Sequence, residues 1–375
     1  MHMENAYLKE QIITYMGNKR KILPFIQQIV IELEGKLGRK LSIGDGFAGS
    51  GVVSRLFKTS AKELHTNDIS SYSYILNKCY LSSPSDEFMI ELDKYIEKAN
   101  NIASLWKEPL PSEQKWVSRH WSPSERIIKK GERTYFTMEN GRRIDLLRNY
   151  IETVPEEFKN HLLANLLVKT SIHNNTNGQF SAFFKDGDVG AYGGKNSVDV
   201  KRITSPIIIE TPVLHSNDCN VNISKMDTNA WVKEIPELDL VYYDPPYNKH
   251  PYNIYYFMLD IVSDWDKTLV IPDTNRGQPK SWTKSDYNST IHAEKTFRDL
   301  IENTKARYIL LSYNDGGIIE LKKLDEILGC YGNVSKYPID HKVYNRLKGL
   351  SNYKRVQEFK EVKEFLWLLE KTQVE

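Results

Sequence analysis

The spacing of hydrophobic residues predicts alternating helices and strands in the first part of the chain. Residues 19–37 carry apolar side chains at intervals of three and four, which is typical of an amphipathic helix. A short strand is predicted at 41–45 and a second at 61–67, leading to Asp68, and helical spacing follows them at 52–57 and 72–81. This strand–turn–helix–strand order indicates a parallel α/β sheet.

The pattern changes in the middle of the chain. From about residue 83 to residue 205, polar, basic and aromatic loops alternate with helical stretches at 86–105, 144–150 and 157–170. Strand patterns return at 206–210, 238–243, 308–312 and 364–369. We therefore expect one α/β domain formed by residues 1–85 plus 206–375, split by a largely helical insertion at 86–205.

The composition narrows the class of protein. A content of 40% hydrophobic and 27% charged residues is typical of globular chains. No apolar run reaches the roughly 18 residues of a membrane span, and the N-terminus lacks the apolar core of a secretion signal, so we expect a cytoplasmic protein without membrane contact. Cys79, Cys219 and Cys330 have neither disulfide nor zinc-site spacing, so we expect packing residues and no metal. The net charge of +2 leaves any nucleic-acid-binding face to local clusters.

A glycine-rich turn follows the first predicted strand. Residues 45–51 read Asp-Gly-Phe-Ala-Gly-Ser-Gly, and glycines at a strand end let the backbone approach a ligand closely. Asp68 follows the next predicted strand, where an acidic residue often holds ribose hydroxyls. The spacing is not G-x-G-x-x-G, and G-x-x-x-x-G-K-[ST] is absent, which disfavours dinucleotides and nucleoside triphosphates. A plain turn remains the alternative.

The tetrapeptide Asp244-Pro245-Pro246-Tyr247 directly follows the apolar predicted strand at 238–243. Two prolines make a rigid end whose carbonyls have no competing donor. A carboxylate, a free carbonyl and an aromatic ring are thereby held at the carboxyl end of a strand, where open α/β sheets bind ligands. An aromatic amine needs two hydrogen-bond acceptors and a stacking face, which this group supplies. The alternative is a rigid turn.

Basic residues gather in three further places. Residues 15–20 read Tyr-Met-Gly-Asn-Lys-Arg and, taken alone, predict a solvated turn before a helix. Lys249 and Tyr252 lie in an aromatic stretch after the tetrapeptide, which either lines a pocket mouth or begins a buried helix. The insertion carries a cluster that either contacts phosphates and guanine edges or forms a solvated face: Arg119, Arg126, Lys129, Lys130, Arg133, Arg142 and Arg143.

Together these motifs resemble the DNA adenine-N6 methyltransferases of the DNA adenine methylase type, including restriction-modification enzymes. The order is that family's alpha arrangement, in which the target-recognition region lies between the glycine turn and the catalytic tetrapeptide. Residues 135–141, 175–180 and 311–315 are similar to the family as well. The resemblance implies a Rossmann-like methyltransferase domain with a mixed, mostly parallel sheet and a target-recognition insertion.

The resemblance also implies a cofactor, S-adenosylmethionine, and residues that bind it. Its methionine end would be bordered by Tyr15, Met16, Gly17, Asn18 and Lys19. The turn beneath it would be formed by Asp45, Gly46, Phe47, Gly49 and Gly51. Asp68 and Ile69 would meet the ribose, and Asp218 the adenine amino group, with Cys219 at a position where the family often has a larger apolar residue.

The reaction expected is direct methyl transfer to N6 of an adenine extruded from duplex DNA. Asp244 and the Pro245 carbonyl would accept the two amino protons, and Tyr247 would stack on the base. A separately encoded restriction endonuclease is the expected functional partner. An initial Asp disfavours methylation of cytosine N4 or of protein glutamine, whose enzymes begin the tetrapeptide with Ser or Asn. An RNA substrate and a catalytically dead scaffold stay open as alternatives.

Overall fold

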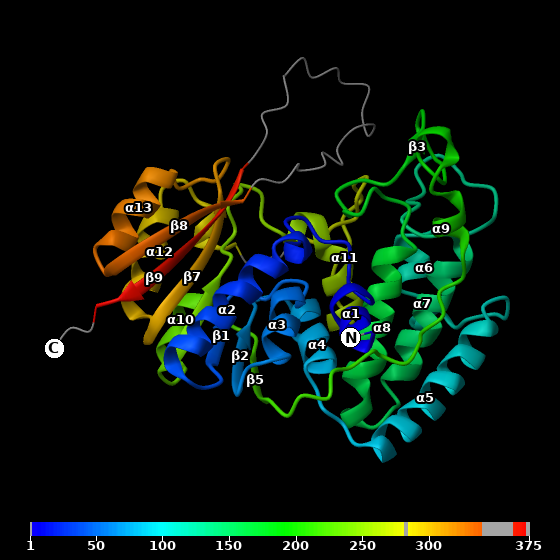
Figure 1. The fold of residues 1–375 in the computed structure, drawn as a ribbon. Coiled ribbons are helices and arrows are strands. Elements are labelled where there is room, and N and C mark those ends of the chain that lie inside the picture. Colours follow the sequence, from blue (N-terminus) through cyan, green and yellow to red (C-terminus); the bar gives the residue numbers. More distant parts are fainter. Residues whose placement is uncertain (1, 281–283, 340–362, 373–375) are drawn as a thin grey trace.

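A seven-stranded sheet forms the centre of the protein in the computed structural model, which describes residues 2–280, 284–339 and 363–372 (Figure 1). The strand order is β5-β2-β1-β6-β7-β9-β8. The strands are β1 (Ser42–Asp45), β2 (Glu63–Asn67), β5 (Asn220–Ser224), β6 (Leu238–Tyr243), β7 (Ala306–Asn314), β8 (Gly332–Ile339) and β9 (Glu364–Lys371). The predicted mixed, mostly parallel sheet is confirmed.

Strand direction places the candidate chemistry at one edge. Strands β5, β2, β1, β6 and β7 run parallel, whereas β9 is antiparallel to both β7 and β8. From β1 the chain moves outward to β2 and β5, while β6 and β7 continue on the other side. The order therefore reverses between β1 and β6, and ligands of open α/β sheets bind in the crevice at such a point.

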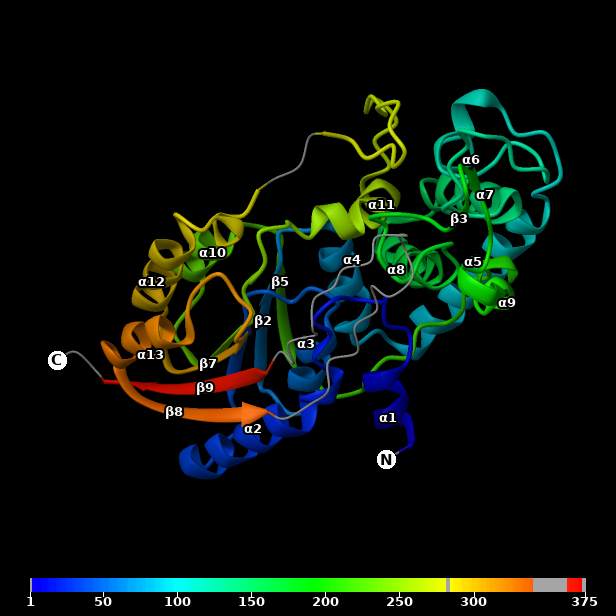
Figure 2. The same cartoon turned by 90° about the horizontal axis from the view of Figure 1, so that it is seen from above.

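Helices cover both faces of the sheet (Figure 2). The helices α2 (Leu23–Leu37) and α3 (Val52–Lys58) bury one face together with the strands. The helices α10 (Thr228–Glu234), α12 (Ala293–Asn303) and α13 (Leu321–Gly329) bury the other. Proline at the start of α2 and a left-handed Gly38 at its end, with φ +68, define that helix.

The segment 86–205 contains helices, as the hydrophobic pattern predicts, and a short two-stranded hairpin that the sequence analysis does not predict. Its elements are α5 (Asp86–Ser104), α6 (Val117–His120), α7 (Met138–Ile151), α8 (Glu156–Ile172), α9 (Val200–Thr204), and the short strands β3 (Lys185–Asp186) and β4 (Val189–Gly190). The side chains of Ser85 and Thr137 accept backbone N–H bonds at the starts of α5 and α7.

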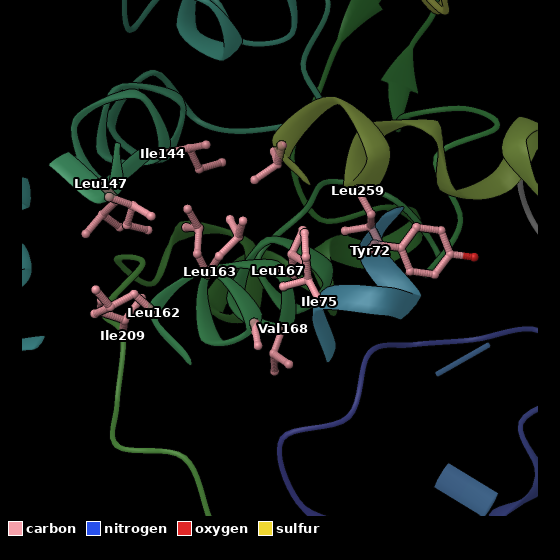
Figure 3. Close-up of a cluster of buried hydrophobic side chains, with 14 of the residues drawn as sticks. Tyr72, Ile75, Ile144, Leu147, Leu162, Leu163, Leu167, Val168, Ile209 and Leu259 are labelled. Atoms are coloured by element: carbon pink, nitrogen blue, oxygen red, sulfur yellow. The ribbon is translucent and has the colours of Figure 1, made fainter. Parts of the chain in front are cut away.

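The insertion shares a hydrophobic core with two helices of the sheet domain, α4 (Ser71–Tyr80) and α11 (Asn253–Asp264). Figure 3 shows Tyr72 and Leu259 from those helices beside Leu163 and Leu167 of α8. All four side chains are almost completely buried. The insertion is therefore packed against the sheet domain through a continuous apolar interior.

The predicted strand at 206–210 is wrong. This segment is extended and buries Ile207 and Ile209, but asparagine side chains replace a neighbouring strand as its hydrogen-bond partners. Asn100 of α5 both accepts from the Ile209 N–H (3.0 Å) and donates to the Ile209 carbonyl (2.9 Å). Asn140 of α7 accepts from the Ile207 N–H at 2.9 Å. The apolar pattern reports burial against helices, which periodicity alone does not distinguish from a sheet.

The structure also shows where the cysteines lie and whether the described residues contain membrane-spanning helices or metal-ligand clusters. Cys79 and Cys219 are buried, as expected of packing residues, but Cys330 is exposed. No helix in the described part of the chain combines the length and apolarity needed to cross a membrane. Among the same residues, no group of three or more His, Cys, Asp or Glu side chains is arranged to hold a metal ion.

Candidate active site

The glycine turn begins at the carboxyl end of β1, next to β6. The Gly46 N–H donates to the Tyr242 carbonyl at 3.0 Å, which joins the turn to β6. Gly49 has φ +52, and a Cβ atom there would lie 3.0 Å from the Tyr15 ring. Glycine is required at this position because the backbone is left-handed and the aromatic ring already fills the space.

Asp45 anchors this turn from inside. Its side chain is fully buried and accepts hydrogen bonds from the Ser54 hydroxyl at 2.6 Å and the Phe47 N–H at 3.4 Å. Burial raises the pKa of Asp45 to about 7. Phe47 packs edge-on against Tyr287, with ring centroids 5.3 Å apart. The carboxyl group therefore fixes the shape of the turn.

Asp68 closes the turn from the neighbouring strand. Its carboxylate accepts the Gly49 N–H at 2.8 Å and the Ser70 N–H at 2.9 Å. Burial raises the pKa of Asp68, although the side chain remains partly exposed at the sheet edge. Ile69, beside it, is 42% exposed. This placement is the one expected for a carboxylate that holds a ribose.

The segment 15–19 crosses over the turn. The Tyr15 ring stacks on Tyr256 and Tyr252 of the α11 region, with centroids 4.7 Å and 5.4 Å apart. The Met16 N–H donates to the Tyr256 hydroxyl at 2.5 Å. Gly17 has φ +73, and a Cβ atom there would lie 2.5 Å from the Tyr247 hydroxyl. Aromatic stacking thus binds Tyr15 to the α11 region, and Gly17 lies close against Tyr247 of the tetrapeptide.

Asp244 lies directly after β6, and its charge is balanced by a buried lysine. The Lys19 ammonium is 3.1 Å from Asp244 Oδ1 and 2.6 Å from Glu364 Oε1. Burial raises the pKa of Asp244 to about 6, with Lys19 lowering it and Glu364 raising it. Burial opposes the charged ammonium of Lys19, but the two carboxylates outweigh this and hold its pKa well above its usual range.

Tyr247 ends the tetrapeptide in a half-buried aromatic position. Its ring lies edge-on to Tyr313, with centroids 6.0 Å apart at 78°. Its carbonyl accepts the Ile318 N–H at 3.1 Å, which fixes the backbone beyond the two prolines. Burial raises the pKa of the Tyr247 hydroxyl, which also bonds to Tyr252. Pro245 is buried, and Pro246 is partly exposed.

Asp218 and Cys219 do not belong to this site, which corrects their predicted role. They precede β5, whose first residue, Asn220, pairs with Glu63 at the start of β2. Both residues therefore lie at the amino ends of the parallel strands, opposite the turn and the tetrapeptide. The acidic residue at the carboxyl end of β5 is Asp227, whose side chain caps α10.

The basic residues of the insertion are mostly engaged within the protein. Arg133 donates to the carbonyls of His120, Pro272 and Thr274, at 2.8–3.1 Å. The other contacts are Arg143 with Glu139, Lys129 with Glu125, Lys130 with Asp188, Arg142 with the Trp106 carbonyl and Arg119 with the Ser112 carbonyl. Arg126 is exposed, and none of the described carboxylates is ion-paired with it. Lys249 is exposed beside the tetrapeptide, whereas Tyr252 is stacked inside the site.

The residues at this edge fit S-adenosylmethionine. The turn offers backbone without side chains at Gly49 and Gly51, and Asp68 offers a carboxylate beside it. In the segment 15–19, Asn18 Nδ2 is a buried donor for which the described residues supply no acceptor. A backbone cradle, a carboxylate and a buried donor match a sugar hydroxyl and a carboxyl group of one ligand.

Three contributing residues escaped the sequence analysis. Glu364 begins a predicted apolar strand, and the sequence gives no signal that its carboxylate reaches the site. Tyr256 was read as either core or pocket lining, and it serves the site by bonding Met16. Ser54 had no signal, because a serine inside a helix looks like any other small residue.

Comparison with known proteins supports the resemblance. The family model described as D12 class N6 adenine-specific DNA methyltransferase matches residues 15–327. The type II methyltransferase M.NlaIII of Neisseria lactamica is 28% identical over 366 residues, which cover 96% of this chain and 100% of the relative. M.CviAII of Paramecium bursaria Chlorella virus 1 is 25% identical, covering 88% and 92%. M.FokI of Planomicrobium okeanokoites is 28% identical over 95% of this chain, which spans about half of that relative (52%).

Proposed function

Because the chain belongs to the D12 class N6 adenine-specific DNA methyltransferase family, we propose that it modifies adenine at a defined duplex sequence as part of a restriction-modification system. The observation that carries the assignment of the site is the position of Asp244, at the reversal of strand order and beside the glycine turn. S-adenosylmethionine supplies the electrophilic methyl group when bound.

The tetrapeptide holds the adenine amino group. Asp244 Oδ2 and the Pro245 carbonyl accept its two protons, which localises the nitrogen lone pair and makes it a better nucleophile. Pro246 keeps the backbone rigid, and Tyr247 stacks on the base, an interaction worth roughly 1–3 kcal/mol. As the bond from the methyl carbon to nitrogen forms, its bond to the sulfonium sulfur would break and the sulfur would leave as a neutral thioether. The nitrogen is then positive and releases one proton to the Asp244 carboxylate.

The cofactor residues act from the other side of the crevice. Asp68 binds the ribose hydroxyls, with Ile69 beside it, and the turn of Asp45, Gly46, Phe47, Gly49 and Gly51 lies beneath. The methionine end meets Tyr15, Met16, Gly17 and Asn18. Lys19, predicted to join this set, serves Asp244 instead, because its ammonium is engaged by two carboxylates. Asp227 takes the acidic position that the sequence analysis gave to Asp218.

Adenine N6 is reached only after the base leaves the duplex. Residues 86–205 form the target-recognition region in this proposal, and Lys249 beside the tetrapeptide contacts the backbone near the displaced base. Within the insertion, exposed cations offer the first phosphate contacts: Arg119, Arg126, Lys129 and Lys130. Arg133 contributes by holding the loop that carries those cations, whereas Arg142 is bonded to the Trp106 carbonyl and Arg143 to Glu139 of the same helix.

Tritium transfer from labelled S-adenosylmethionine to mixed-sequence duplex DNA tests the reaction and the substrate. Label recovered as N6-methyldeoxyadenosine supports the proposal, and sequencing of the modified positions gives the recognition site. Label in RNA but not in duplex DNA would contradict the duplex substrate. Absence of label despite calorimetric cofactor binding would revive the dead-scaffold alternative.

The restriction context is tested separately. Plasmid recovered from cells that express the chain should resist an endonuclease that cleaves at the modified sequence. The names of the relatives support this context, since M.NlaIII and M.FokI are called type II methyltransferases. Plasmid that carries the methyl mark but is cut by every endonuclease recognising that sequence would contradict a protective role.

A further inference from the structure

Glu364 lies in the active site because its strand, β9, is antiparallel to β7. The first residue of β9 therefore lies beside Asn314, at the carboxyl end of β7. The parallel strands end at this same edge, where Asp244 follows β6. A residue about 120 positions away in the sequence is thereby brought to the tetrapeptide. Its side chain is only 14% exposed.

Two contacts hold Glu364 in one orientation. The fully buried Ser312 hydroxyl on β7 donates to Glu364 Oε1 at 2.8 Å. The Lys19 ammonium lies 2.6 Å from the same oxygen, closer than its 3.1 Å distance to Asp244 Oδ1. A charge-assisted contact as short as the one between Lys19 and Glu364 is strong. The ammonium is therefore held mainly from the β9 side.

We propose that Glu364 is a positioning residue for Asp244, holding the Lys19 ammonium against Oδ1 so that Oδ2 stays free for the adenine amino group. This inference rests on the proposed role of Asp244. Lysine carries its charge on four flexible methylene groups, and an ammonium has no preference between the two oxygens of a carboxylate. Without a second anchor, the ammonium would move between Oδ1 and Oδ2 and compete with the substrate for the acceptor.

The charge of Glu364 also affects how readily Asp244 accepts a proton. A carboxylate paired with an uncompensated ammonium is a weaker acceptor, because the neighbouring cation stabilises its negative charge. Glu364 offsets that cation and raises the pKa of Asp244, whereas Lys19 lowers it. The titratable groups that face Asp244 are Lys19, Glu364, Asp45, Tyr242, Tyr247 and Tyr252.

A purely structural role for Glu364 predicts something different. In that case Glu364 would only tie β9 to the segment 15–19, and its loss would lower the fraction of folded enzyme. The pH dependence of the remaining active molecules would not change. A positioning role predicts instead that the rate of the chemical step and its pH dependence both respond in properly folded enzyme.

The experiment compares single-turnover methylation rates of the full chain over a pH series, with cofactor and duplex DNA saturating. In Glu364→Gln, we expect the plateau rate to fall roughly ten- to a hundredfold, since a misplacement of about 1 Å can cost 10²-fold. The acidic limb should move to lower pH, because a charge that raises the pKa of Asp244 is gone. In Lys19→Met, the acidic limb should move to higher pH.

Two further variants keep the test decisive if Glu364→Gln folds poorly. Glu364→Asp retains the charge but shortens the reach, so the plateau should fall while the acidic limb stays near its wild-type position. Glu370→Gln removes the same charge from the far end of β9, where Glu370 pairs with exposed Arg307, and should behave as wild type. Cofactor affinity should be unchanged in all of the Glu364 and Glu370 variants.

A wild-type plateau and acidic limb in folded Glu364→Gln would overturn the inference. So would acidic limbs that move in the same direction in Glu364→Gln and Lys19→Met. Failure of the underlying role of Asp244 is seen independently, as undiminished turnover in an Asp244 variant.

Discussion

The carboxyl edge of the sheet and the basic loops of the insertion use charged side chains in opposite ways. At the sheet edge, Lys19 contacts Asp244 and Glu364, which come from distant parts of the sequence and are largely buried. In the insertion, Arg143 pairs with Glu139 and Lys129 with Glu125, four residues away on the same segment. One region builds a site from remote residues, and the other mostly satisfies charges locally.

Burial of an ion pair determines which role its charged side chains can have. Buried charges that meet across the fold lose their solvent and must be paired, which fixes their geometry. Exposed pairs contribute roughly 0–1 kcal/mol and exchange partners easily, so a phosphate can displace a carboxylate. The sheet edge is therefore suited to catalysis, and the exposed cations of the insertion are suited to a ligand that arrives with its own charge.

The largest effect is expected from Asp244→Asn. The amide keeps the shape but replaces an acceptor oxygen and removes the charge, so the single-turnover rate should fall about 10²–10³-fold. Cofactor affinity, measured by calorimetry, should change little. Asp286→Asn, an exposed position of the same domain, is the control. Full turnover of Asp244→Asn would show that the carboxylate is not needed for the chemistry.

Variants of Asp68 and Asp218 test which end of the parallel strands binds the cofactor. Asp68→Ala should weaken S-adenosylmethionine binding roughly ten- to a hundredfold, since hydrogen bonds to a charged group contribute about 1.5–3 kcal/mol. Asp218→Ala should leave the dissociation constant unchanged, because Asp218 lies at the opposite edge. Thermal unfolding of both variants checks that the turn is intact. Loss of affinity in Asp218→Ala would return Asp218 to the cofactor site.

Substitution of Arg133 tests whether a cation of the insertion stabilises the folded protein. Arg133→Ala leaves the carbonyls of Pro272, Thr274 and His120 without this donor, so we expect the free energy of unfolding to drop by about 1–3 kcal/mol. Denaturant titration measures the change. An unaltered stability together with weaker DNA binding would assign Arg133 to the interface instead.

The smallest effect is expected at Arg126. Arg126→Ala should weaken binding of all duplex sequences alike and reduce the slope of log K against log salt by about 0.9, as expected for one lost phosphate contact. Stability should not change, since the side chain is exposed. Lys322→Ala, an exposed cation on α13, is the matched control. An unchanged salt slope would place Arg126 outside the DNA footprint.

The sequence predicted the sheet edge well because its chemistry is tied to strand ends. Asp45 ends one predicted strand, Asp68 and Asp244 directly follow two others, and parallel strands bring their carboxyl ends to one edge. Asp218 is misplaced because the predicted strands do not include β5, which has an acidic residue on either side. Without the strand's direction and limits, Asp218 and Asp227 are equivalent candidates.

The remaining features depend on contacts that no local pattern encodes. Glu364 enters the site only because β9 is antiparallel, and the apolar run at 364–369 carries no sign of direction. The basic cluster of the insertion was identified as a group. The sequence could not show that Arg133 is turned toward carbonyls, because those carbonyls belong to residues about 140 positions later.

The extended segment at 206–210 has a consequence for any exchange of the insertion with that of a related protein. This segment connects the insertion to the sheet domain. The side chains of Asn100, Asn140 and Asn165 accept hydrogen bonds from its backbone N–H groups. Further along, the Gln11 side chain accepts from the Val213 N–H and donates to the Thr211 carbonyl. Inserted regions are often treated as units that can be exchanged at their sequence boundaries. Here an exchanged insertion would have to include residues 206–210 and the asparagines that bind them. Otherwise these backbone hydrogen bonds would be lost.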